Sequence, residues 1–282
     1  MSGIEGEIEL LRKYCLGRHD ISMAFIFGSY AKGMEISESD FDVAVYFNPK
    51  EMRVEWLEDQ LYPEENKIGL DVERIIGIDM DLVVLNRVRP TVAFEILKTG
   101  IPLVIKDRKL YLEFYLIISQ EAEDFREFIK DYWLTYQRSK SLSEEERAEL
   151  IERIQFLDSE IREFTDYRNL TLKVYKEDKF QRRNIERWIE TLVMALIDVG
   201  KIILASEGRK MPSTYTEGLL DLCLLTGFDE EEGKEFAQFA KLRNILAHEY
   251  LDIRFQKIRN FIGGAESGYK RILEFVKSIV AL

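Results

Sequence analysis

The chain has 282 residues, which is long enough for two domains that each bury a core. The composition is that of a globular protein, with a hydrophobic content of 46% and a charged content of 33%. The formal net charge of −12 makes the chain poorly suited to broad electrostatic binding of nucleic acid, although a local basic surface could still bind RNA. The apolar runs are too short for a membrane span, and the acidic start does not fit a secretory signal. The two cysteines are isolated, which argues against a disulfide framework or a zinc site, so we expect a cytoplasmic protein.

The first part of the chain alternates between helical and strand patterns. Helical spacing over residues 5–16 precedes two apolar strands, at 21–27 and up to Phe47, and a third strand is predicted at 78–86. Helices are predicted at 51–61, 66–75 and 92–97, and a last strand at 101–105. Together these elements predict a small mixed α/β unit.

The connection between the first two strands contains residues suited to phosphate and metal binding. Gly28 and Ser29 follow a buried strand, where glycine permits a close approach and the turn can offer N–H groups and a hydroxyl to a phosphate. Asp40 and Asp42 are two apart in a strand pattern, so their carboxylates project from the same face. Two adjacent anions indicate a bound cation, and hard oxygen ligands suit Mg²⁺ on nucleotide phosphates.

The spaced pattern Gly-Ser, Ala-Lys-Gly and Ser-Asp-Phe-Asp, followed by Val-Ala-Val, resembles the minimal nucleotidyltransferases of the polymerase-beta-like superfamily. The resemblance implies ATP as substrate and a third carboxylate on a neighbouring strand. Asp81, directly before an apolar run, is favoured over Asp79, which would face the same way. Mg²⁺ would then be held by Asp40, Asp42 and Asp81. Lys32 could assist a phosphate or simply face solvent.

The remainder of the chain is helical in pattern. An apolar stripe over 111–136 ends at a break, where Ser143 and Glu146 fit a capping box, and we place the domain boundary there, giving domains 1–140 and 141–282. Further helices are predicted at 185–203, 212–227, 229–246 and 272–279. The predicted fold class is therefore α/β plus all-α, with an up-and-down helical bundle following the small sheet domain. A basic cluster could be either an RNA-binding surface or a solvated loop and helix start: Lys173, Lys176, Lys179, Arg182, Arg183 and Arg187.

Within this helical part, Arg243, Asn244, His248 and Tyr250 form the pattern Arg-Asn-x3-His-x-Tyr. The pattern resembles the signature of HEPN domains, a helical family that includes many metal-independent ribonucleases. On a helix, Arg243 and Tyr250 fall nearly above one another, and His248 is displaced from Arg243 by roughly 140°. The resemblance implies a homodimer in which two such edges form one cleft. There, neutral His248 could deprotonate an RNA 2′-hydroxyl, and Arg243 would hold the scissile phosphate. Asn244 would orient either a partner group or the phosphate.

In pairs that resemble these two halves, the nucleotidyltransferase is an antitoxin that transfers AMP from ATP to the tyrosine of its HEPN toxin. We therefore expect a toxin-antitoxin-like chain that adenylylates Tyr250 of its own HEPN domain and restrains its RNase, within one chain or between two. One alternative is an adenylyltransferase acting on a small molecule such as an aminoglycoside, with the bundle as its substrate-binding or dimerisation domain. Another is a bundle that only dimerises or binds a partner, beside a silent first domain.

Overall fold

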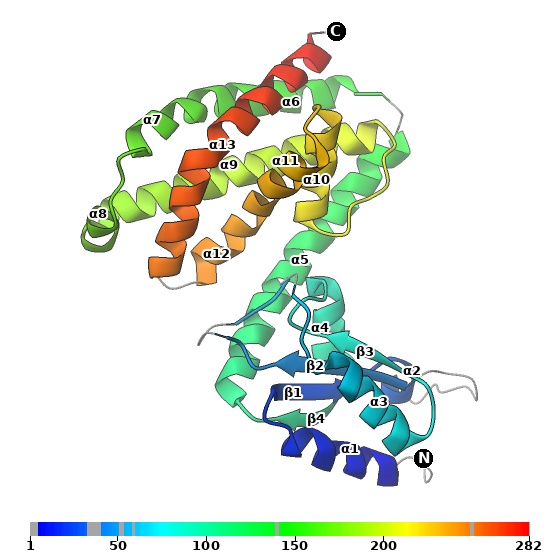
Figure 1. Cartoon of the computed structure of the whole chain (residues 1–282). Helices are drawn as coiled ribbons and strands as arrows, with labels where there is room; N and C mark the ends of the chain where they lie inside the picture. Colours follow the sequence, from blue (N-terminus) through cyan, green and yellow to red (C-terminus); the bar gives the residue numbers. More distant parts are fainter. Residues whose placement is uncertain are drawn as a thin grey trace. The chain divides into compact units, whose positions relative to one another are not determined.

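A computed structural model describes residues 5–32, 41–50, 54–57, 60–138, 141–248 and 251–281 of the chain (Figure 1). Of the site residues predicted above, Asp40 and Tyr250 lie outside the described residues, and the side chains of Lys32, Asn244 and His248 are also not described. Among the described residues, none of the helices combines the length and the apolar character that a membrane span requires.

Four strands form one sheet in the first part of the chain. They are β1 (Ile21–Ile26), β2 (Phe41–Phe47), β3 (Met80–Val84) and β4 (Ile101–Ile105), in the order β3-β2-β1-β4. Strand β1 is antiparallel to both β2 and β4, whereas β2 and β3 are parallel. The predicted mixed sheet is confirmed.

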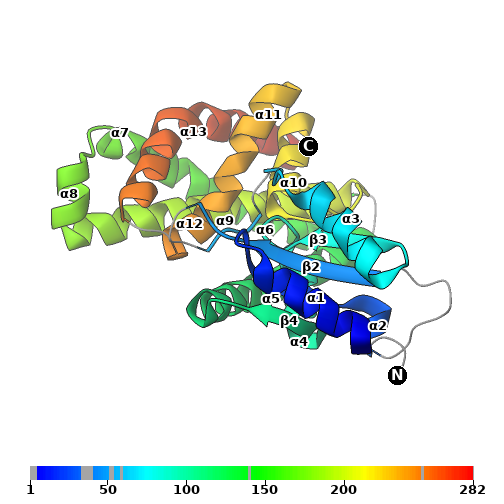
Figure 2. The ribbon, with the colours of Figure 1, turned by 60° about the horizontal axis from the view of Figure 1, so that its bottom comes forward.

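Helices cover both faces of this sheet (Figure 2). Helices α1 (Glu5–Gly17) and α3 (Glu65–Ile76) place Leu11 and Ile68 against one face, which includes Val43 and Val45 of β2. Helix α4 (Pro90–Thr99) and the first turns of α5 (Arg108–Arg138) pack on the other face, which includes Ala44 and Tyr46. Successive side chains of β2 point to opposite faces of the sheet, because a strand has a two-residue period. This alternation also determines the face on which each charged residue at the strand ends lies.

The helix predicted at 51–61 is wrong, because none of the described residues in that stretch is helical. Glu55 is buried, and its carboxylate accepts hydrogen bonds from the Lys50 N–H at 2.7 Å and the Tyr62 hydroxyl at 3.2 Å. The Tyr46 hydroxyl donates to the Glu55 carbonyl at 2.8 Å and accepts from its N–H at 2.7 Å. A buried carboxylate must be hydrogen-bonded, and these bonds hold the chain in a loop.

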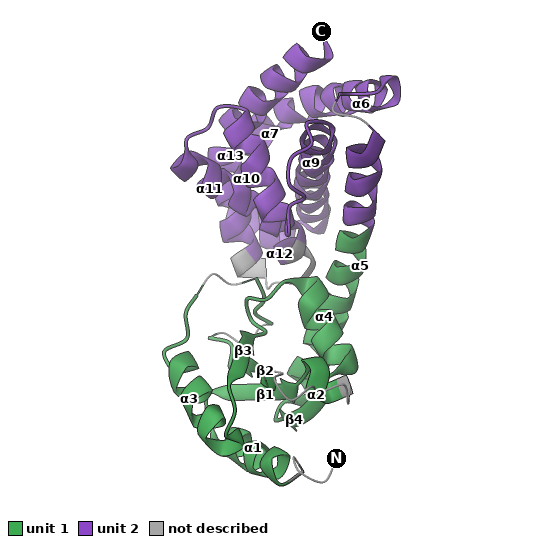
Figure 3. Ribbon diagram, turned by 90° about the vertical axis from the view of Figure 1, so that its right-hand side faces the viewer, with its two compact units in different colours: residues 1–126 green, residues 127–282 purple. Residues whose placement is uncertain are grey.

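The chain divides into two compact units, residues 1–126 and 127–282, and the division falls inside α5 (Figure 3). The second unit is a helical bundle, as predicted. Its central helix is α9, which packs against α6, α8, α10 and α12. The elements after α5 are α6 (Glu144–Glu160), η1 (Ile161–Glu163), α7 (Phe164–Tyr167), α8 (Leu172–Glu177), α9 (Lys179–Ser206), α10 (Tyr215–Leu225), α11 (Glu230–Ala237), η2 (Gln238–Lys241), α12 (Leu242–His248) and α13 (Leu251–Val280).

Helix ends in the bundle follow local sequence signals. The capping box at the start of α6 is confirmed, since Ser143 Oγ accepts from the Glu146 N–H at 3.2 Å and the Glu146 carboxylate accepts from the Ser143 N–H at 2.7 Å. The single helix predicted over 229–246 is wrong, because the 3₁₀ segment η2 separates α11 from α12. Phe236 near the end of α11 and Phe239 in η2 both contact aromatic side chains of α13.

Candidate functional site

The end of β1 and the start of β2 meet at one end of the sheet. The Phe27 N–H donates to the Asp42 carbonyl at 3.0 Å, and Gly28 follows with φ +70°, a left-handed backbone conformation that favours glycine. A β-carbon built on Gly28 would lie 1.9 Å from Asp42 Oδ2. The carboxylate of Asp42 therefore lies directly against the Gly28 backbone, and no other residue type fits there.

Asp81 is the register partner of Asp42 across the parallel pair β2 and β3. Register partners on parallel strands present their side chains on the same face, so two carboxylates stand side by side at this sheet end. Asp42 is half-buried and Asp81 is exposed. Asp79 precedes β3, and its carbonyl accepts from the Phe41 N–H at 3.0 Å, so its backbone closes the strand pair.

This donor set fits a hard divalent cation. Adjacent carboxylates repel one another unless a cation lies between them, and Mg²⁺ is bound by one or two carboxylates together with substrate phosphates. Among the described residues, no group of three His, Cys, Asp or Glu side chains could hold a metal ion. Asp40, the remaining carboxylate predicted for this site, lies outside the described residues.

The short helix α2 (Gly28–Lys32) begins at the turn that carries Gly28 and Ser29. Ser29 is half-buried, and the ring of the next residue, Tyr30, packs against Phe41 with the centroids 4.9 Å apart. Lys32 is the last residue of α2. The Tyr30 contact fixes the turn against the first residue of β2, and the sequence pattern did not indicate this anchor.

The second predicted site lies on α12. Leu242 and Leu246 are buried, so this helix is anchored by two apolar side chains one turn apart. The guanidinium of Arg243 lies 5.8 Å from the ring centroid of Tyr215 on α10, a distance at which a cation is attracted to an aromatic face. Asn244 and His248 belong to the same helix, whereas Tyr250 lies outside the described residues.

A charged network that sequence reasoning missed joins three helices near the start of α13. The Tyr175 hydroxyl donates to Glu186 at 2.5 Å, and Arg254 Nη1 donates to the same carboxylate at 3.3 Å. Burial, with the hydrogen bond to Glu186, raises the pKa of Tyr175 well above its usual value. The partners are 11 and 68 residues from Glu186 in sequence, so no local pattern could have paired all three.

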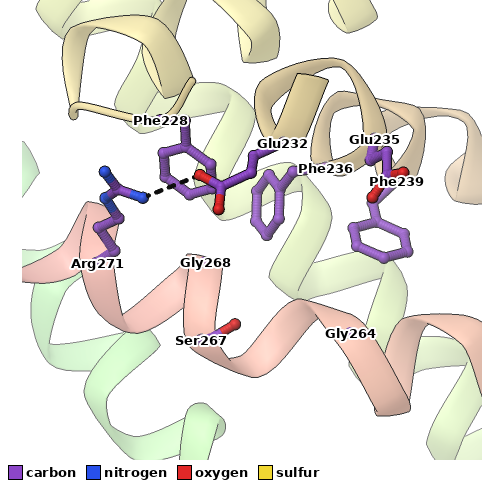
Figure 4. A pocket seen from close by; sticks show the side chains of 9 residues that line it. All are labelled: Phe228, Glu232, Glu235, Phe236, Phe239, Gly264, Ser267, Gly268 and Arg271. Carbon is purple, nitrogen blue, oxygen red and sulfur yellow. Dashed lines mark hydrogen bonds and ion pairs between the residues drawn. The ribbon is translucent and has the colours of Figure 1, made fainter. Parts of the chain in front are cut away.

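A cavity of about 390 Å³ also opens between α11 and α13 (Figure 4). Its floor is the α13 backbone at Gly264 and Gly268, and the rings of Phe236 and Phe239 form a wall. At its rim the Arg271 guanidinium lies 4.5 Å from the Phe228 ring centroid. None of the predicted site residues lines this cavity.

Comparison with known proteins identifies two domains. The family model "Polymerase beta, Nucleotidyltransferase" matches residues 9–109, and the model "Ribonuclease HepT-like" matches residues 157–279. A crystal structure described as a toxin-antitoxin with AMP-PNP matches with a TM-score of 0.34 and 17% identity, over 43% of this chain and 89% of that one. A search of curated proteins gave no match.

Proposed function

We propose that this chain, in which a polymerase-beta nucleotidyltransferase domain precedes a HEPN-like domain, transfers AMP from ATP to a protein tyrosine and so restrains an RNase in the same chain. The transferase half of this proposal rests on one observation, which is that Gly28, Asp42 and Asp81 lie together at one end of the sheet. The two activities together would make the chain toxin-antitoxin-like.

In this proposal Asp40, Asp42 and Asp81 hold Mg²⁺, which when bound neutralises charge on the nucleotide phosphates. The turn at Gly28 and Ser29 binds the phosphates, with Lys32 as a further candidate. The acceptor hydroxyl attacks the α-phosphorus while its proton passes to the Asp81 carboxylate. The bond from the α-phosphorus to the bridging oxygen breaks, and pyrophosphate leaves in line. Register beside Asp42 supports Asp81 over Asp79 for this role.

We propose Tyr250 as the acceptor and a homodimer of the helical unit as the RNase. His248 would take a proton from an RNA 2′-hydroxyl, Arg243 would stabilise the charge on the phosphate, and Asn244 would orient it, giving a 2′,3′-cyclic phosphate and a 5′-hydroxyl. AMP attached to Tyr250 would place bulk and negative charge two residues from His248. RNA phosphate would then be repelled and sterically excluded.

The test is self-labelling of purified protein by Mg²⁺ and α-labelled ATP, after any attached AMP has been removed enzymatically. The wild type is compared with Asp42→Ala, with Tyr250→Phe and with Glu9→Ala, an exposed acidic residue on α1, which covers the opposite face of the sheet. Label on the wild type and Glu9→Ala, absent from the other two, supports the proposal. If stripped wild type stays unlabelled but modifies added aminoglycosides, the chain is instead a small-molecule adenylyltransferase.

The RNase half is tested separately on stripped protein. Single-stranded RNA should be cut to products with cyclic phosphate ends by the wild type but not by His248→Ala. Prior self-labelling should slow the cut in the wild type and leave Tyr250→Phe unaffected. Equal cutting before and after labelling would refute the proposed restraint.

A further inference from the structure

The first two turns of α9 present an exposed aromatic ring among cations. We call Lys179, Phe180, Arg183 and Arg187 the α9 stripe. At about 100° per residue these four positions fall within a single arc of the helix surface. The Phe180 side chain is 80% exposed, and the three cations are exposed as well. Single exposed apolar side chains are common on protein surfaces, so the Phe180 ring is informative only because three exposed cations share its arc of the helix.

The charge of this region is opposite to that of the whole protein. Residues 168–187 contain seven basic and three acidic residues, a formal charge of +4 in a chain of −12. Two of the three acids are occupied, because Asp178 caps α9 through the N–H groups of Phe180 and Gln181, and Glu186 binds Tyr175 and Arg254.

The cations of the stripe are available to a ligand. Lys179 and Arg183 form no ion pair with any residue that the structure describes, and Arg187 pairs only with exposed Glu190 at 2.9 Å. Surface pairs of this kind are weak and are readily exchanged for a phosphate. The positive charge is therefore concentrated on the same arc as the exposed ring.

The stripe is rigidly connected to the start of α13. Tyr175 packs against Phe255 with the centroids 5.5 Å apart, and Glu186 pairs with Arg254 at 3.3 Å. Helix α13 begins at Leu251, three residues after His248, and Figure 1 shows α8, the start of α9 and the start of α13 at one end of the bundle. A ligand lying along the stripe would thus lie close to the described start of α13.

We infer that the α9 stripe docks single-stranded RNA, an inference that rests on the proposed RNase function. A base stacks on the Phe180 ring, and Lys179, Arg183 and Arg187 bind flanking phosphates. Single strands are recognised by this combination of aromatic platforms and cations, whereas the bases of a duplex cannot reach a ring on a convex helix. A symmetric contact between the stripes of two protein copies fits less well, because it would place cations of one copy against cations of the other, and like charges across an interface are unfavourable.

The inference is tested in the full chain carrying His248→Ala and Tyr250→Phe, which by the proposal neither cuts RNA nor accepts AMP. Binding of a fluorescein-labelled single-stranded 12-mer is followed by anisotropy at several salt concentrations. Phe180→Ala should weaken binding about tenfold with the salt dependence retained, and Phe180→Trp should bind like the parent. Lys179→Glu/Arg183→Glu should weaken binding and reduce the logarithmic salt slope by about 0.7 for each phosphate that is no longer bound.

The matched control is Lys109→Glu/Lys130→Glu, which changes the net charge equally at exposed positions of α5. If this control loses as much affinity as Lys179→Glu/Arg183→Glu, or if Phe180→Ala binds like the parent, the inference is wrong. Conversion of a dimer to a monomer by Phe180→Ala, measured by light scattering, would show a protein contact instead. The two proposals fail separately, since RNA can bind the stripe without being cut, and the wild type can cut RNA without using the stripe.

Discussion

A β-carbon on Gly28 would lie 1.9 Å from Oδ2 of Asp42, far inside any real contact distance. Gly28→Ala must therefore displace the carboxylate, in addition to a cost of about 1–2 kcal/mol for a left-handed backbone. We expect transfer of AMP from α-labelled ATP to fall by about 100-fold or more, because small displacements of reacting groups have large effects on rate.

The control for this variant is Gly77→Ala. Gly77 has φ +74°, close to that of Gly28, but nothing lies within 4 Å of the position of its β-carbon. Gly77→Ala should lose thermal stability through backbone strain alone and keep the wild-type transfer rate. Equal losses of activity in both variants would attribute the effect of Gly28→Ala to strain alone.

The parallel register predicts different roles for two acids two residues apart. Asp81 lies beside Asp42, whereas Asp79 contributes a carbonyl to the Phe41 N–H. Asp81→Asn should reduce the transfer rate by about 100-fold or more, the range for loss of a general base. Asp79→Asn retains the backbone bond and should stay close to the wild type. A larger loss in Asp79→Asn, measured by self-labelling over a range of Mg²⁺ concentrations, would reverse the assignment.

Most elements could be predicted from the sequence because their signals are local. Strand β4 occupies the predicted 101–105, since an apolar run bounded by Gly100 and a charged residue specifies both ends. The helix predicted at 51–61 failed because the burial of Glu55 depends on Tyr46, nine residues away on a strand. Composition alone cannot show that a glutamate will be buried.

At the sites, the sequence indicates residue types but not their pairing. Asp42 and Asp81 each lie at the start of a strand pattern, yet their parallel register depends on how β2 and β3 associate in the folded sheet. Likewise, the Arg-x4-His spacing does not indicate that Arg243 lies over Tyr215. Contacts between distant segments are set by packing, which a local period does not encode.

The Glu65–Arg87 pair predicts a pH-dependent contribution to stability in the first unit. Arg87 donates to both carboxylate oxygens of Glu65, at 2.6 and 2.5 Å. Burial opposes ionisation of Glu65, but hydrogen bonds from Arg87 and the Tyr62 N–H hold its pKa below 4.5. We expect Glu65→Gln to lower the free energy of unfolding by about 2 kcal/mol at pH 7, the range for a charged hydrogen bond.

A carboxyl group whose pKa is lower in the folded protein than in the unfolded chain stabilises the fold at pH values above its pKa in the unfolded chain. This stabilisation is lost as the pH falls through its pKa in the folded protein. The difference between wild type and Glu65→Gln should therefore shrink in urea unfolding at pH 3.5. The control is Glu127→Gln, whose exposed carboxylate lies 3.7 Å from Lys130 and should matter little at either pH. If the difference in unfolding free energy between the wild type and Glu65→Gln is the same at pH 7 and pH 3.5, the ionised Glu65–Arg87 pair is not the source of that difference.

We predict that replacing two glycines of α13 by alanine has opposite effects on the free energy of unfolding. Gly263 has no atom within 4 Å of a built β-carbon, so Gly263→Ala should stabilise by about 1 kcal/mol through helix propensity. At Gly268 the β-carbon would lie 2.2 Å from Phe236 Cε2, so Gly268→Ala should destabilise by about 1–3 kcal/mol through overpacking (Figure 4). Urea unfolding measures both. Phe236→Leu should relieve part of the Gly268→Ala loss, and purely additive losses would exclude this contact as the cause.

The contact between Arg243 and Tyr215 predicts that an aromatic ring on α10 positions the proposed phosphate-binding group on α12. Tyr215→Phe keeps the ring 5.8 Å from the guanidinium and should retain RNA cleavage. Tyr215→Leu removes the ring and should slow cleavage about 2- to 30-fold, which corresponds to a cation–π attraction of about 0.5–2 kcal/mol. The assay is cleavage of a quenched fluorescent RNA by stripped protein, with Tyr136→Leu as the control for losing a ring elsewhere in the bundle. The Tyr215 ring also packs edge-on against Phe128 with the centroids 5.2 Å apart, so a double variant isolates the contact with Arg243. If the ring affects cleavage through Arg243, Tyr215→Leu should have no further effect in an Arg243→Ala background, and an additive loss there would assign Tyr215 a separate role.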